Sequence, residues 1–116
     1  VNSSKKSFYS AEKREEWVKN TFKNYDNIFV KKYSGLTINF AEKENAEFIF
    51  RGLRSSLDYE YEKQIAETNS VLNKEIETIF LLSDKQYGMI SSSIVREIIK
   101  NNGNIKGFVP KEVKIS

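Results

Sequence analysis

Apolar residues recur along the chain with two different spacings, and these spacings predict an alternation of helices and strands. Helical spacing predicts helices over four ranges: 10–24, 36–44, 56–73 and 91–102. Short runs of consecutive apolar residues predict strands over three others: 28–33, 46–50 and 78–82. Strands that are apolar on both faces and separated by helices are typical of an α/β fold, in which helices cover both sides of a parallel sheet.

Single residues indicate where some of these elements begin, end and face the core. Ser10 can cap the first helix, because its hydroxyl can accept a hydrogen bond from an unpaired first-turn N–H group. Gly103 suits a left-handed stop to the last helix. In the short helix 36–44, Leu36, Phe40 and Ala41 share one side. The long helix carries a stripe that we expect to be buried: Leu57, Tyr61, Ile65, Thr68 and Leu72.

The composition limits the chemistry that this chain can perform. Its 116 residues suit one domain over 1–116 and include no cysteine and no histidine. Disulfides, thiolate nucleophiles, His-containing metal sites and a Ser-His-Asp triad are therefore excluded. Any chemistry must use Lys, Arg, carboxylates, Tyr, hydroxyls or backbone N–H groups. Three strands make a thin sheet, and the strand–loop–helix unit that normally opens an α/β domain is not in this sequence.

Charge and hydropathy argue against two classes of partner. There are 19 Lys and Arg against 16 Asp and Glu, a net charge of +3, which is small for a nucleic-acid-binding protein. The longest uninterrupted apolar run, Ile79–Leu82, is too short to cross a membrane. The absence of cysteine fits a reducing compartment, and we expect a cytoplasmic protein.

The clearest candidate site is Arg51-Gly52-Leu53-Arg54, which follows a predicted strand. Ligands of open α/β sheets bind beyond the carboxyl ends of the strands. Two guanidinium groups with a glycine between them can approach phosphates closely and bind them bidentately. The alternative is that these arginines pair with Asp58, Glu60 or Glu62, and the spacing does not decide between the two.

Two further groups could lie at the same sheet edge. Ser91-Ser92-Ser93 precedes a helix, where N–H groups and hydroxyls can bind an anion, although a plain N-cap is the favoured explanation of a lone serine run. Lys5-Lys6 is either a solvated pair or a phosphate contact, if a strand ends just before it. Tyr61 is predicted to be a core residue. Glu62 is predicted to be either a surface residue or a contact to a ribose or a metal.

Three stretches resemble the bacterial phosphopantetheine adenylyltransferase family: FRGLRSSLDYEYEKQIAETN, EIETIFLLSDKQYGMISSSIVREIIKNNGNIKGFVP and NSSKKSFYSAEKREEW. The resemblance spans essentially the whole chain. It implies a Rossmann-like nucleotidyltransferase fold and the reaction of ATP with 4′-phosphopantetheine to give dephospho-coenzyme A and pyrophosphate. It also implies Mg²⁺ bound with ATP, coenzyme A as a product-like ligand, and a homohexamer.

The resemblance also implies roles for individual residues. Lys5 and Arg54 match residues that contact the reacting phosphates. The phosphopantetheine site matches Lys5, Thr37, Arg51 and Asn69. The ATP site matches Gly52, Leu53, Arg54, Glu62, Tyr87, Gly88, Met89, Ile90, Ser91, Ser92 and Ser93, with Tyr61 as a neighbour in the same wall.

One family feature is not in this sequence. The family opens with a strand, a G-(S/T)-F-D-P loop and a T/H-x-G-H signature whose last histidine stabilises the transition state; this sequence contains none of these. We therefore expect it to be an incomplete record of an intact enzyme, lacking the first β-α unit, and the 116-residue chain alone to be inactive. The alternative is a non-catalytic fragment that binds coenzyme A or phosphopantetheine.

Overall fold

The computed structural model describes residues 7–115. The chain divides into two compact units, one formed by Gly35–Met89 and the other by Val1–Ser34 together with Ile90–Ser116. The first unit contains a parallel sheet with helices packed on it, and the second contains two helices joined to irregular segments. The predicted α/β class is confirmed by this arrangement.

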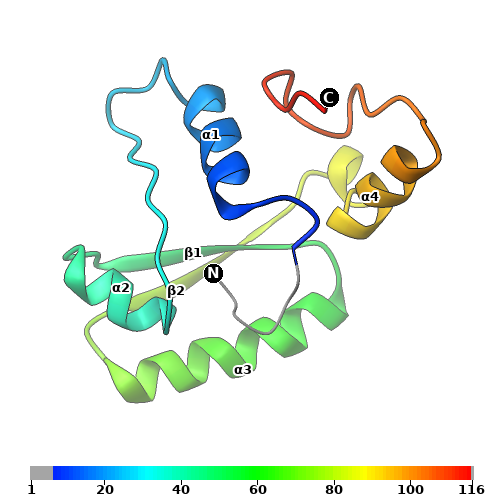
Figure 1. Cartoon of the computed structure of the whole chain (residues 1–116). Coiled ribbons are helices and arrows are strands. Elements are labelled where there is room, and N and C mark those ends of the chain that lie inside the picture. The colour runs from blue at the N-terminus through cyan, green and yellow to red at the C-terminus, as the bar shows by residue number, and fades with distance from the viewer. Residues whose placement is uncertain (1–6, 116) are drawn as a thin grey trace. The chain divides into compact units, whose positions relative to one another are not determined.

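The sheet of the first unit consists of two parallel strands, β1 (Phe48–Leu53) and β2 (Glu77–Leu82). They pair in register from Phe48 opposite Glu77 to Leu53 opposite Leu82. Parallel strands need a crossover connection, and here it is the long helix α3 (Ser56–Leu72), which runs along the strands in Figure 1. This is the strand–helix–strand order that the sequence predicts for residues 46–82.

The ends of α3 follow from local chemistry. The Ser55 hydroxyl accepts a hydrogen bond from the Asp58 N–H at 3.2 Å and so satisfies one of the first-turn donors. At the other end the Asn73 N–H donates to the Asn69 carbonyl at 2.9 Å, after which the chain becomes extended. The predicted range of 56–73 therefore agrees with the structure to one residue.

The core of this unit lies beside α2 (Thr37–Lys43). Ile38, which is only 1% exposed, packs with Ala41 and Ile76, and the partly buried Ala46 and Ile49 lie against them. The prediction that Leu36 shares the inner side of this helix is wrong. Leu36 is instead the N-cap residue and is 56% exposed, because the buried face is the one that carries Ile38 and Ala41.

The predicted apolar stripe of α3 is not buried. Leu57 is 81% exposed and Tyr61 66% exposed, so the assignment of Tyr61 to the core is wrong. Among residues 7–115 the buried polar side chains are Glu62 and Asn69, and each follows a residue of the predicted stripe by one position, so they lie on a neighbouring side of this helix. The helix is turned this way because an ion pair between Glu62 and β1 fixes which side faces the sheet.

The second unit contains α1 (Ala11–Thr21) and α4 (Ser92–Lys100). Ser10 caps α1 as predicted, accepting from the Lys13 N–H at 3.1 Å, but the helix ends three residues before Asn24. The buried Trp17 ring packs edge-on against Tyr9.

Residues 28–33, predicted to be a strand, form no regular secondary structure and belong to no ladder within the part of the chain that the structure describes. The β-rich composition is present, yet an extended segment becomes a strand only when a neighbouring strand accepts its hydrogen bonds. The predicted three-stranded sheet is therefore wrong for the described residues, which contain two paired strands.

The end of α4 differs from the prediction in one residue. The left-handed position is Asn102, with φ of 56°, and not Gly103. The Gly103 N–H donates to the Ile98 carbonyl and the Asn102 N–H to that of Ile99, which is the Schellman pattern. Gly103 is instead required for space, because a Cβ there would lie 2.7 Å from Cγ2 of Ile98.

In residues 7–115, no helix has the length and apolar character needed to span a bilayer.

Candidate functional site

The candidate site begins with Arg51 on β1, whose side chain is held by Glu62 on α3. The Glu62 Oε2 atom accepts from Nε of Arg51 at 2.9 Å, and Oε1 accepts from Nη2 at 2.7 Å. This is a bidentate pair, the strongest geometry available to arginine and a carboxylate. The Glu62 side chain is 11% exposed and that of Arg51 is 50% exposed, so the carboxylate partner is buried while half of the arginine side chain reaches solvent.

The position of Arg51 in the sheet explains how this pair forms. Successive side chains of a strand point to opposite faces, so Arg51 shares a face with the half-buried Ile49 and the buried Leu53. That is the face on which α3 lies, as its ion pair with Arg51 shows. The prediction that the strand ends before Arg51 is wrong, because β1 continues through Leu53 and only Arg54 follows it.

The second arginine has a partner of its own on the first turn of α3. The Asp58 Oδ2 atom accepts from the backbone N–H of Arg54 at 3.0 Å and from its Nε at 3.2 Å. These bonds, the backbone one first, hold the pKa of the Asp58 carboxyl below its usual range. The ion-pairing alternative from the sequence is therefore confirmed for both arginines, with Glu62 and Asp58 as the partners and Glu60 not involved.

The lowered pKa of Asp58 predicts how the stability of the chain depends on pH. A carboxyl whose pKa is lower in the folded state stabilises the fold above its unfolded pKa, and this contribution is lost as the pH falls through the folded value. We expect Asp58→Asn to lower the urea midpoint at pH 7, and the difference from the unmodified chain to shrink towards about pH 3. Urea unfolding at both pH values measures this.

Glu60→Gln is the matched control for that measurement, because Glu60 is exposed on the same helix and removing its charge changes net charge equally. A deficit of Asp58→Asn that stayed the same at both pH values would show that the ionised carboxylate is not what stabilises this turn.

Gly52 lies between the two arginines in a place where the protein itself does not require a glycine. Among residues 7–115, no heavy atom lies within 4 Å of a Cβ built there, and the residue does not adopt the left-handed backbone conformation. Neither packing nor backbone strain therefore explains the absence of a side chain. Open space above a strand residue next to two guanidinium groups is what a closely approaching ligand would need.

The same unit contains other residues of the predicted site. Thr37 is the first residue of α2, and Asn69 is buried on α3. Tyr87 is the last residue of the short 3-10 helix η1 (Lys85–Tyr87), which Asp84 caps at its start and Gly88 at its end. The side chains of Tyr87 and Met89 are both exposed. Their contacts with any ligand stay predictions.

The other unit contains the serines of the predicted nucleotide site. The Ser91 hydroxyl accepts from the Ile94 N–H at 3.2 Å and caps α4, as the plain-cap alternative predicts. The Ser93 hydroxyl accepts from Nη2 of Arg96 at 3.2 Å, while Ser92 is exposed, and Ile90 precedes the cap. Lys5, predicted to contact the reacting phosphates, lies outside the described residues.

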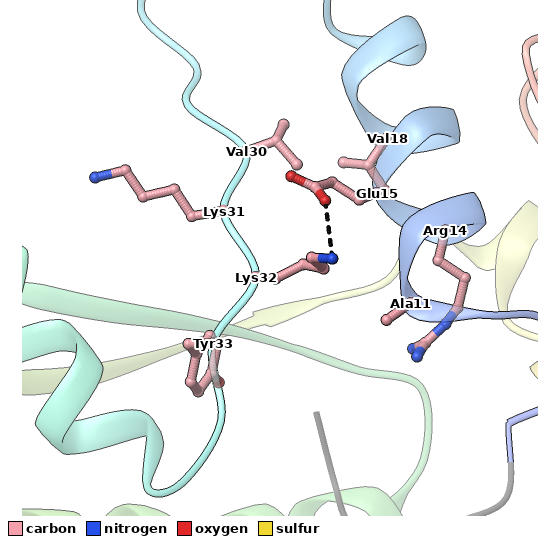
Figure 2. A pocket seen from close by; sticks show the side chains of 8 residues that line it. All are labelled: Ala11, Arg14, Glu15, Val18, Val30, Lys31, Lys32 and Tyr33. Carbon is pink, nitrogen blue, oxygen red and sulfur yellow. Dashed lines mark ion pairs between the residues drawn. The ribbon is translucent and has the colours of Figure 1, made fainter.

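A hollow that sequence reasoning did not find lies between α1 and residues 30–33, inside the second unit. Figure 2 shows Val18 and Val30 facing each other across it, with Lys32 reaching towards Glu15. Lys32 Nζ binds Glu12 at 2.9 Å and Glu15 at 3.5 Å, and these pairs raise the pKa of Lys32. The pKa of Glu12 is lowered chiefly by Lys32, and that of Glu15 chiefly by Lys19 and then by Lys32. Among its charged lining residues, Lys32 and Glu15 pair with each other.

The described side chains form no binding site for the expected magnesium ion. Residues 7–115 contain no group of three or more His, Cys, Asp or Glu side chains placed to hold a metal ion. The two carboxylates nearest the candidate site, Asp58 and Glu62, each bind an arginine. The side chains described here therefore do not fit a protein-bound metal centre.

Comparisons with known proteins show the family to which this chain belongs. Residues 1–98 match the family model described as cytidylyltransferase-like. The phosphopantetheine adenylyltransferase of Flavobacterium psychrophilum is 48% identical over 115 residues, covering 99% of this chain and 76% of the relative. That of Prochlorococcus marinus subsp. pastoris is 47% identical over 113 residues, covering 97% and 71%. The enzyme of that name from Clostridium perfringens is 42% identical over 113 residues, covering 97% and 69%. The chain therefore belongs to the phosphopantetheine adenylyltransferase family.

Proposed function

We propose that this protein transfers the adenylyl group of ATP to 4′-phosphopantetheine, a step of coenzyme A biosynthesis. A phosphate oxygen of 4′-phosphopantetheine attacks the α-phosphorus of ATP and forms the new P–O bond. The bond from that phosphorus to the β-phosphate oxygen breaks, so dephospho-coenzyme A forms and pyrophosphate leaves. No covalent enzyme intermediate is needed, and the protein contributes positioning and charge stabilisation.

The observation that carries this proposal is the fixed guanidinium of Arg51, in a chain that belongs to this family. Arg51 is proposed to hold the phosphate of 4′-phosphopantetheine, because a planar guanidinium matches the oxygens of a phosphate bidentately. Holding that phosphate in place turns the attack on ATP into an effectively intramolecular step.

The nucleotide is proposed to lie beside Gly52 and Arg54. The open space above Gly52 lets phosphates approach the backbone, and the Arg54 guanidinium offsets the charge that builds up on them. Lys5 is proposed as the second cation on the reacting phosphates. Thr37 and Asn69 are assigned to phosphopantetheine, and the segment from Tyr87 to Ser93 to the nucleotide, as the family resemblance implies.

Three further properties belong to this proposal. Magnesium is proposed to arrive bound to the phosphates of ATP, which supply the oxygen ligands that it prefers, and no step above passes through it. A homohexamer is supported by large apolar side chains left exposed on the first unit, such as Leu57, Val71 and Leu82. A cytoplasmic location is supported by the absence of cysteine.

The test uses the protein expressed from its complete reading frame, with ATP and 4′-phosphopantetheine as substrates. We expect pyrophosphate release that depends on both substrates, with dephospho-coenzyme A identified by mass spectrometry. CTP in place of ATP is the matched nucleotide control, because the family model is described as cytidylyltransferase-like. Binding of 4′-phosphopantetheine without any product would contradict the proposal and favour a non-catalytic binding protein.

A further inference from the structure

The C-terminal end of α4 carries the one Asn-Gly pair of this sequence, Asn102-Gly103. Both residues are exposed and directly follow the C-cap residue of the helix, Asn101. In an Asn-Gly pair the backbone nitrogen of the glycine can attack the side-chain amide of the asparagine, because the glycine has no β-carbon to hinder the approach. The pair is therefore a candidate site of spontaneous modification.

The end of the helix requires residues of these two types. Asn102 has a φ of 56°, a conformation that asparagine and glycine adopt readily and that most other residues avoid. At Gly103, an added Cβ would lie 2.7 Å from Cγ2 of Ile98 and 3.2 Å from its carbonyl oxygen. The cap that ends α4 thus places a chemically labile pair where few replacements of either residue fit.

The same cap also restrains the reaction. The attacking atom is the nitrogen of Gly103, whose N–H donates to the Ile98 carbonyl at 2.8 Å, while the Asn102 N–H donates to that of Ile99 at 3.0 Å. Attack requires the Gly103 N–H to lose its proton, and the hydrogen bond to Ile98 keeps that proton in place and fixes the direction of the nitrogen. The reaction therefore has to wait until the cap opens.

The side chain of Asn102 differs from those of the asparagines on either side of it. Nδ2 of Asn101 donates to the carbonyl oxygen and to Oε1 of Glu97, at 2.9 and 3.0 Å. Oδ1 of Asn104 accepts from the Lys106 N–H at 2.9 Å. Within the described part of the chain, no hydrogen bond holds the side chain of Asn102. Once the cap opens, this amide can turn towards the attacking nitrogen without losing a partner.

We propose that Asn102 is a deamidation site, and that opening of the α4 cap controls its rate. When the Gly103 N–H leaves the Ile98 carbonyl, hydroxide takes its proton and the nitrogen forms a bond to Cγ of Asn102. The bond from Cγ to Nδ2 breaks, and the leaving nitrogen takes a proton from water and departs as ammonia. Water then opens the cyclic imide at one of its two carbonyls, giving aspartate or isoaspartate.

Either product weakens the cap from which it forms. Aspartate adds a negative charge at the carbonyl end of α4, where the helix dipole disfavours anions. Isoaspartate adds a carbon atom to the main chain, so the N–H groups of residues 102 and 103 no longer meet their two carbonyl partners together. We therefore expect a slow, irreversible loosening of the end of α4.

The test incubates the protein expressed from its complete reading frame at mildly alkaline pH, with and without concentrated urea, and locates the modification by peptide mass spectrometry. Trypsin cleaves after Lys100 and Lys106, so one peptide carries Asn102 together with Asn101 and Asn104 as internal controls. We expect product at Asn102 before either neighbour. In the native protein it should form about tenfold more slowly than in urea, because opening the cap costs about as much as losing a hydrogen bond.

A variant separates the chemistry of the pair from the fold. Gly103→Ala is compared with the unmodified protein in urea, where the cap plays no part and a failure to fold does not matter. The added β-carbon should slow product formation at Asn102 several-fold and leave Asn101 unchanged.

Equal rates in the native protein and in urea would show that the cap does not control the reaction. Product at Asn101 or Asn104 as fast as at Asn102, or product at Asn102 in urea but none from the native protein, would overturn the assignment. The readout is a mass, so it does not depend on whether the protein transfers adenylyl groups.

Discussion

Replacing Arg51 by alanine is expected to weaken binding of 4′-phosphopantetheine by about a thousandfold, because hydrogen bonds to charged groups contribute roughly 1.5–3 kcal/mol each. The bidentate contact proposed for its guanidinium supplies two such bonds to one phosphate. Isothermal titration calorimetry of the protein expressed from its complete reading frame measures the change directly. Affinity for ATP, titrated in parallel, should fall much less, because Arg54 and not Arg51 is assigned to the nucleotide.

The same substitution also leaves Glu62 without its partner. Breaking a fully buried pair costs roughly 3–5 kcal/mol. Here half of the Arg51 side chain is exposed, so water can reach the vacated position and the loss of stability should be smaller. Thermal unfolding must therefore accompany the titration. Lys63→Ala is the control, since Lys63 is an exposed cation of α3 with only a 3.8 Å contact to Glu67. An Arg51→Ala protein that folds and binds 4′-phosphopantetheine normally would remove Arg51 from the site.

Replacing Ile38 by alanine is expected to give the largest loss of stability, about 2–5 kcal/mol, as for other buried Ile or Leu to Ala changes. Ile38 packs with Ala41 and Ile76 and is 1% exposed, so three lost carbon atoms leave a cavity at the centre of this cluster. Urea unfolding followed by circular dichroism measures the difference in unfolding free energy.

Leu36→Ala is the matched control for that experiment. Leu36 lies two residues earlier, is 56% exposed and caps α2 without a side-chain hydrogen bond. We expect its unfolding free energy to change by less than about 1 kcal/mol, because little apolar area returns to water. Equal effects of the two substitutions would mean that α2 is held to the sheet by some other contact.

Local patterns predicted the elements of this chain well. The hydroxyls of Ser10 and Ser91 cap the helices that they were expected to cap, because capping depends on only three or four neighbouring residues. The strand–helix–strand unit was also predictable, since its apolar runs and its long helical stretch are contiguous. The family followed from its motifs, and the comparisons confirm it.

Local patterns did not predict which side of α3 is buried against the sheet. The apolar stripe of α3 suggested that Tyr61 is buried, but the helix turns Glu62 inwards because that carboxylate reaches Arg51 eleven residues away. Residues 28–33 have the composition of a strand, yet a strand also requires a partner, which composition does not encode. Both errors arise from long-range pairing that overrides an intrinsic preference.

The two ion pairs of the site are nested along the chain: Arg51 with Glu62 encloses Arg54 with Asp58. Closing a short loop costs little conformational entropy, and the inner pair, once formed, shortens the loop that the outer pair must close. The spacing of the two arginines is therefore set within twelve consecutive residues. The geometry of the proposed phosphate site is thus set by one continuous segment, in which a substitution at either carboxylate acts on the arginine that it binds.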